Sequence, residues 1–173
     1  MNDRQRSQQL VVCEGCGAQV PDISGPTHSY MPSAPGCWAA HGELVARGIH
    51  LEAAGGSSQL RTDAYAAQHA TNPEPRNRQS VAIHLMSLCA TFDLGLPPGR
   101  TTHLMGGWTH RPGGYPDLTS SRRHGSLTVV DALEGSDALG YEIAVDRWAR
   151  SVWAGWAPRH AAIRRLLEEH GVQ

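Results

Sequence analysis

The sequence predicts a mostly α-helical fold, a single-domain helical bundle with a Cys- and His-rich segment at its N-terminal end. Apolar residues recur at helical spacing in several segments, most clearly at Val81, Leu85 and Leu88. The segment from Cys13 to His41 is different, because three of the four cysteines and two of the ten histidines fall among its glycines and prolines. Such a segment has little apolar surface to bury, so something other than a hydrophobic core must order it.

The 173 residues are enough for one domain with a real core. We place this domain at residues 11–173, after a disordered tail at 1–10, and divide it into the Cys/His segment at 11–41 and a helical body at 42–173. The formal net charge of −1 gives no electrostatic case for nucleic acid or an anionic membrane, so we expect neither as a partner. All fifteen basic side chains are arginines, which excludes Schiff-base lysine chemistry and a Walker-type phosphate-binding lysine.

The chain has no apolar run near the ~20 residues that span a bilayer. Its polar start also lacks the apolar core of a signal peptide. We therefore expect a cytoplasmic protein with reduced thiols, in which metal binding is favoured over disulfides. Cys89 stands alone in an apolar helical segment and is expected to be a small core residue.

Local signals predict the elements of the helical body. Apolar spacing, together with prolines at the starts and ends of segments, indicates helices, and Thr128 followed by Asp131 resembles a capping box. Val11 and Val12 are expected to form a short strand. Residues 99–126, rich in Gly, Pro, Thr and Arg, indicate a functional or disordered loop. The expected helices are residues 37–48, 60–70, 78–94, a short one from 128, 137–156 and 158–169.

The Cys/His segment has the residue types and spacing of a zinc-knuckle-like site. The two-residue gap lets the Cys13 and Cys16 thiolates reach one ion, and Cys37 supplies a third sulfur. The fourth ligand must come from nearby. His41 follows Cys37 by one helical turn, as in zinc-finger helices, whereas His28 lies in a loop that could fold back on the knuckle. The alternative is that these are ordinary reduced cysteines in a loop-rich segment and bind no metal.

A second constellation lies on the predicted helices. Tyr65, Gln68 and His69 share one face of the helix at 60–70, while Asp63 points well away from His69. His84, on the next helix and flanked by hydroxyl side chains, offers a general base or a metal ligand. If the two helices face each other, His69 and His84 could converge on one metal or one substrate. The alternative is a hydrogen-bonded tyrosine and two histidines at the edge of a core.

The motifs in their order along the chain resemble an uncharacterised bacterial family of small proteins of unknown function. They are Cys-x-x-Cys-Gly-Ala, Gly-Pro-Thr-His, Gly-Cys-Trp, Asp-x-Tyr-x-x-Gln-His and Ser-Val-x-x-His-Leu, and the resemblance runs from Cys13 to about His160. It implies that many members carry Tyr at the position of His41, which favours His28 as the fourth ligand. It implies no reaction. The residues that match its motifs are Cys13, Cys16, His28, Tyr30, Cys37, Trp38, Asp63, Tyr65, Gln68, His69, Ser80, His84 and Trp153.

The sequence thus predicts a zinc protein and leaves two functions open. In the first, an enzyme carries out metal-assisted hydrolysis or tailoring of a small molecule or peptide, with one metal position open to water. In the second, four protein ligands complete the coordination of the metal, and the metal only stabilises the fold of a binding or interaction module. The predicted metal ligands are Cys13, Cys16, His28 and Cys37, and the candidate catalytic residues are Asp63, Tyr65, Gln68, His69 and His84. A third arrangement would hold the metal by His28, His69 and His84, with the cysteines as bystanders.

Overall fold

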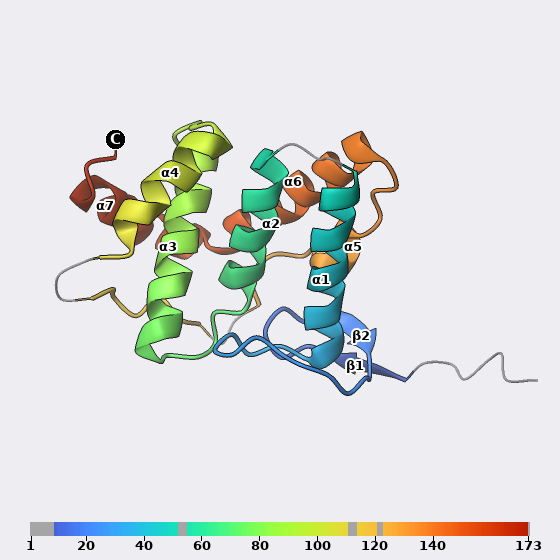
Figure 1. Ribbon diagram of the computed structural model, residues 1–173. Helices are drawn as coiled ribbons and strands as arrows, with labels where there is room; N and C mark the ends of the chain where they lie inside the picture. Colours follow the sequence, from blue (N-terminus) through green and yellow to red (C-terminus); the bar gives the residue numbers. More distant parts are fainter. Residues whose placement is uncertain (1–8, 52–54, 111–113, 121–122, 173) are drawn as a thin grey trace, which may run out of the picture.

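The computed structural model describes residues 9–51, 55–110, 114–120 and 123–172, and it is mostly helical (Figure 1). Helices α1, α2 and α3 stand side by side, with α4 against α3 and with α6 crossing behind them. The elements are β1 (Leu10–Val12), β2 (Gln19–Pro21), α1 (Pro35–His50), α2 (Gly55–Gln68), α3 (Pro75–Phe92), α4 (Pro98–Trp108), α5 (Val129–Ala132), α6 (Ala138–Gly155), a 3-10 turn (Ala157–Arg159) and α7 (His160–Glu169).

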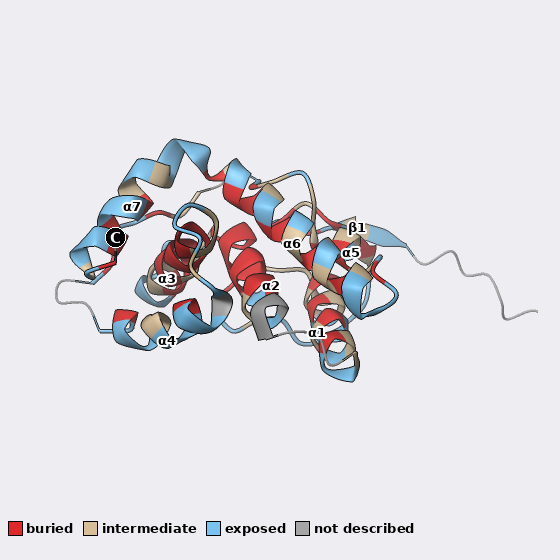
Figure 2. Cartoon of the chain, turned by 90° about the horizontal axis from the view of Figure 1, so that it is seen from above, coloured by how far each residue is buried: buried red, intermediate tan, exposed pale blue. Residues whose placement is uncertain are grey.

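Helix α2 is the central element of the bundle. Viewed from above, it lies among α1, α3, α4 and α6, and its described residues are largely buried (Figure 2). Its alanines are small and allow this close packing from several sides. As a result, Ala64, Ala66 and Ala67 have almost no exposed surface. Both faces of α2 are therefore inside the protein, including the polar face that carries Gln68 and His69.

The helix ends follow the expected local chemistry. The capping box at Thr128 is confirmed, since the Val130 amide donates to the Thr128 hydroxyl and the Thr128 amide donates to Asp131. The Asp137 carboxylate caps α6 in a similar way by accepting from the Gly140 amide. These side chains satisfy amide groups that have no partner within their own helix.

The two N-terminal strands form an antiparallel hairpin in which Val11 lies opposite Val20. Its turn, residues 13–18, is closed by the Cys13 amide, which donates to the Ala18 carbonyl, and by Gly17, whose φ is +82°. The hairpin lies against the start of α1 through Gly36: a Cβ there would stand 2.3 Å from the Pro21 carbonyl oxygen. This contact brings the Cys13–Cys16 turn beside the first turn of α1.

The structure corrects two expectations. The stretch 99–126 was expected to be loop throughout, yet α4 occupies its first part. Pro98 suits the first helical turn, and Trp108 becomes buried with Leu104 packed against the core, so tertiary packing outweighs the cost of Gly106 and Gly107. The second strand, β2, was also not expected.

Two further boundaries concern the tail and membranes. Residues 1–8 of the expected disordered tail lie outside the described residues, and Leu10 opens β1. Within the described part of the chain, no helix has both the length and the apolar character needed to cross a membrane.

Candidate metal centre

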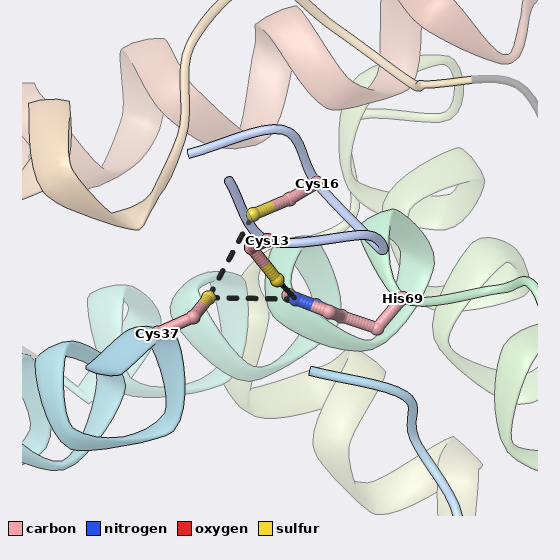
Figure 3. Close-up of side chains that lie close together, drawn as sticks. All are labelled: Cys13, Cys16, Cys37 and His69. Atoms are coloured by element: carbon pink, nitrogen blue, oxygen red, sulfur yellow. Dashed lines mark hydrogen bonds between the residues drawn. The ribbon is translucent and has the colours of Figure 1, made fainter. Parts of the chain in front are cut away.

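Three cysteines and one histidine meet at the junction of the hairpin, α1 and α2 (Figure 3). The ligand atoms of Cys13, Cys16, Cys37 and His69 all lie within 4.8 Å of one another. All four residues are buried, with 4% of Cys16 exposed and none of the other three. Four soft or borderline donors gathered at one buried point form a donor set that suits a tetrahedral transition metal.

Each ligand is positioned by a different local structure. Cys13 and Cys16 lie at the two sides of the hairpin turn, and Cys37 belongs to the first turn of α1. His69 follows the last residue of α2, and its amide continues the helical bonding by donating to the Tyr65 carbonyl. The site therefore joins three segments that are separated in the sequence.

Three of the six donor–donor distances in the cluster match those of a tetrahedral zinc site, and all six are within 4.8 Å. The Cys16 and Cys37 sulfurs are 3.7 Å apart, and His69 Nε2 is 3.5 Å from each of the Cys13 and Cys37 sulfurs. With Zn–S of roughly 2.3 Å and Zn–N of about 2.05 Å, tetrahedral angles require about 3.7 Å between sulfurs and about 3.5 Å between sulfur and nitrogen. The residues present thus fit the ion by size as well as by chemistry.

The imidazole of His69 is oriented for ligation through Nε2. Its Nδ1 lies 2.7 Å from the Tyr65 carbonyl oxygen, which can only accept, so Nδ1 carries the proton and the Nε2 lone pair faces the sulfurs. Gly15 makes room for the ring, because a Cβ at this position would stand 2.3 Å from His69 Cδ2. The glycine in the Cys-x-x-Cys turn is thus required by the histidine.

In the absence of an ion, the cluster raises the pKa of His69 and lowers that of Cys13, and a bound ion would replace the proton on His69 Nε2. Burial opposes the charged form of His69, but the neighbouring Cys13 and Cys16 raise its pKa to about 9. Hydrogen bonds from Cys16 and Cys37 lower the pKa of Cys13, and the Ala34 amide also donates to its sulfur at 3.4 Å. A thiolate at Cys13 is the form that binds a metal.

His28 does not occupy the place predicted for the fourth ligand, and the structure puts His69 there instead. His28 Nδ1 accepts from the Met31 and Tyr30 amides at 3.3 and 3.4 Å, so it braces its own loop. Its ring packs edge-on against Trp38, with centroids 5.1 Å apart. A nitrogen that accepts two backbone amides has no lone pair left for a metal.

His41, the alternative fourth ligand, lies in a column of rings that leads to the cluster. It stacks between Trp38 and Tyr65, at centroid distances of 5.4 and 4.2 Å, and Tyr65 in turn stacks on His69 at 4.0 Å. Burial lowers the pKa of His41 to about 4, with the positive charge of Arg61 adding to the effect. Burial also raises the pKa of Tyr65, and both side chains are therefore uncharged packing groups beside the cluster.

Of the remaining candidate residues, Gln68 has a structural role, and Asp63 and His84 form a second site. Gln68 is buried and donates to the His124 and Leu127 carbonyls at 2.7 and 2.8 Å, while its own oxygen accepts from Trp148. This network ties residues 124–127 and α6 to α2. Asp63 and His84 form a pair of their own, with 2.7 Å between Oδ1 and Nδ1, and neither belongs to the metal cluster.

The separation explains how the predicted residues fall into two groups. His69 and His84 do not converge on one metal, because His69 turns toward the cysteines and His84 toward Asp63. Among the described residues, the structure does not gather the third arrangement, His28, His69 and His84, as a group of metal-binding donors. From the sequence, His69 is a candidate catalytic residue and not a metal ligand. The sequence hardly indicates that His69 joins the cysteines, since it lies far beyond the range of zinc-finger spacing.

Comparison with known proteins gives a family without an activity. No curated protein and no solved structure matches the chain. A family of unknown function matches residues 11–157, which include all of the hairpin except Leu10, all four residues of the cluster and the Asp63–His84 pair. The chain therefore belongs to this family of unknown function, DUF5946.

Proposed function

We propose that this protein is a zinc protein in which Cys13, Cys16, Cys37 and His69 hold a structural ion. The proposal depends on one observation, four buried protein donors within 4.8 Å of one another, three of whose six distances match tetrahedral spacing. Structural zinc sites are closed by four protein ligands, whereas catalytic sites keep one position for water or substrate. Thiolate-rich donor sets favour zinc over magnesium, calcium or manganese.

The ion would fasten the N-terminal segment to the helical body. The hairpin buries few apolar side chains of its own, chiefly Val20, and two short strands are not stable alone. Zinc would join its turn to the start of α1 and to the end of α2, the central helix. Binding free energy then becomes folding free energy for residues 10–37. This is the second of the two functions left open by the sequence, a metal that shapes a module rather than one that performs hydrolysis.

The test is the metal content of the purified protein, measured by elemental mass spectrometry. We expect about one zinc per chain in the wild type, and loss of zinc in Cys13→Ser and in His69→Ala. His28→Ala and Cys89→Ser are matched controls that remove a histidine and a thiol outside the cluster, and both should keep the ion. Zinc that survives His69→Ala but is lost in His28→Ala would overturn the ligand assignment, and a wild type without metal would overturn the proposal.

A further inference from the structure

Asp63 is a fully buried carboxylate with three hydrogen-bond donors. His84 Nδ1 lies 2.7 Å from Oδ1, Gln59 Nε2 donates to the same oxygen at 2.7 Å, and Ser87 donates to Oδ2 at 2.6 Å. These bonds compensate the burial of the carboxylate and hold it in one orientation. Because a carboxylate here accepts, Nδ1 of His84 carries a proton, and the basic lone pair of the neutral ring is on Nε2.

His84 also lines a surface groove of about 390 Å³ between α3, α4 and the segment before α1. Ile83 and Met105 give the groove apolar walls, and Ser80 lies one helical turn before His84 on α3. Ser80 is 9% exposed, and its hydroxyl has no hydrogen-bond partner among the described residues. A buried hydroxyl without a partner destabilises a packed core. In a groove, the same hydroxyl is available to form a hydrogen bond with a ligand.

A positive group lies at the edge of the same groove. The Arg76 guanidinium lies 4.7 Å from the centre of the Tyr30 ring, and both residues line the groove. Arg76 is exposed, and a guanidinium in this position can pair with a carboxylate or a phosphate through two parallel hydrogen bonds. The groove thus combines an anion-pairing group, apolar walls, a hydroxyl and an oriented imidazole.

We propose that this groove binds a small organic anion through its carboxylate or phosphate group and that His84 exchanges a proton with it. Arg76 pairs with the anionic group, and Ile83 and Met105 contact the body of the ligand. When the ligand carries an O–H group, as dihydrogen phosphate does, His84 Nε2 accepts its proton: an N–H bond forms, the O–H bond breaks, and its electron pair stays on oxygen. The resulting imidazolium is balanced by the Asp63 carboxylate, 2.7 Å from Nδ1.

The site is independent of the metal cluster. Its residues come from α2, α3, α4 and the segment before α1, and none of them is a ligand of the cluster. The groups that face His84 or its groove are Asp63 from α2, Arg76 from α3, and His28 and Tyr30 from the segment before α1. Helix α4 contributes Met105 and Gly106, which do not titrate.

The experiment uses the full-length protein with labelled histidines and follows the His84 ring signals by nuclear magnetic resonance. Inorganic phosphate and acetate are titrated separately at constant pH and ionic strength, and the His84 signal is assigned by its loss in His84→Gln. The matched pair of variants is Arg76→Gln and Arg165→Gln, both at exposed arginines, of which only Arg76 lines the groove. The midpoint of the His84 titration is then measured with and without the saturating anion.

We expect a saturable shift of the His84 signal, with affinity weakened at least fivefold in Arg76→Gln and unchanged in Arg165→Gln. A response to phosphate alone or to acetate alone supports the proposal and identifies the anionic group. Bound anion should also raise the His84 midpoint, which a histidine that only braces Asp63 would not show. Absence of a saturable shift with both anions, equal affinity in the two variants, or an unmoved midpoint would overturn the proposal.

Discussion

Asp63 and His69 lie six residues apart at the end of α2, and their side chains enter two separate sites. Asp63 accepts from His84 at 2.7 Å, and His69 Nε2 faces the sulfurs of Cys13 and Cys37 at 3.5 Å. Six helical residues turn the chain by about 600°, which places the two side chains about 120° apart around the axis. One central helix can therefore support a metal site on one side and a proton-exchanging pair on the other.

Removal of the metal should destabilise the whole domain, because the cluster connects the hairpin to the central helix. Zinc held at ~1000 times its dissociation constant contributes about 4 kcal/mol to folding. For a chain of this length, that free energy corresponds to a fall in Tm of roughly 8–16 °C. Thermal unfolding followed by circular dichroism, with and without a strong chelator, measures the change. The chelator should have no effect on His69→Ala, which has already lost the site, and an equal effect there would contradict the account.

Gly15→Ala should weaken zinc binding through steric pressure on a ligand. The new Cβ would lie 2.3 Å from His69 Cδ2 and 2.7 Å from the Pro32 carbonyl, so the ring or the turn must move. We expect at least tenfold lower zinc affinity and a loss of about 1–3 kcal/mol in the free energy of unfolding. Gly42→Ala is the control, because nothing lies within 4 Å of a Cβ there and Ala suits a helix interior better. It should bind zinc normally and be slightly more stable, and similar zinc affinities in the two variants would refute the steric explanation.

Gln68→Leu should be among the more destabilising single changes in the chain. It would leave the His124 and Leu127 carbonyls and the Trp148 indole N–H without their buried partner. We expect a loss of about 3–5 kcal/mol, with zinc still bound. Gln79→Leu, whose side chain donates to the Thr109 carbonyl in an exposed position, should cost under about 1 kcal/mol. Urea unfolding of both variants gives the comparison, and equal losses would mean that the Gln68 network contributes little.

His41 should make the domain less stable in acid. Its pKa of about 4 in the folded protein lies below the usual value of 6.5, because burial opposes the charged ring. The buried neutral ring therefore costs no stability above pH 6.5. The free energy of unfolding falls by about 3 kcal/mol as the pH falls from 6.5 toward 4. In His41→Phe this part of the acid loss should vanish, and stability at pH 8 should not fall, because His41 Nε2 has no hydrogen-bond partner among the described residues.

The measurement is the free energy of unfolding of both proteins from pH 8 to pH 4. Acid also protonates the cysteines and releases zinc, but this occurs in both proteins, so the difference between their curves isolates His41. Curves that stay parallel over the whole range would show that His41 does not titrate on unfolding.

Local signals in the sequence were sufficient for several features and insufficient for others. The Cys13-x-x-Cys16 turn and the Thr128 capping box depend on residues close together in the chain, and the structure has both of them. The angular separation of Asp63 from His69 followed from helix geometry alone. These features depend on covalent spacing and backbone hydrogen bonds, which sequence reveals directly.

Features that depend on tertiary packing were not accessible in the same way. His69 lies 32 residues after Cys37, and only the packing of α2 against the hairpin turn brings it to the sulfurs. Helix α4 contains two adjacent glycines, and it is stabilised by the burial of Trp108 and by the packing of the helix against α2 and α3. In both cases the decisive contact joins elements that are distant in sequence.

The most direct test of the metal site is X-ray absorption at the zinc edge of the purified protein. We predict a four-coordinate zinc ion, with three sulfurs at about 2.3 Å and one nitrogen at about 2.0–2.1 Å. Replacing His69 by Ala should remove the nitrogen contribution, whereas replacing His28 should leave the spectrum unchanged. Three protein ligands with an oxygen in the fourth position would contradict the account and would indicate an open, catalytic metal instead.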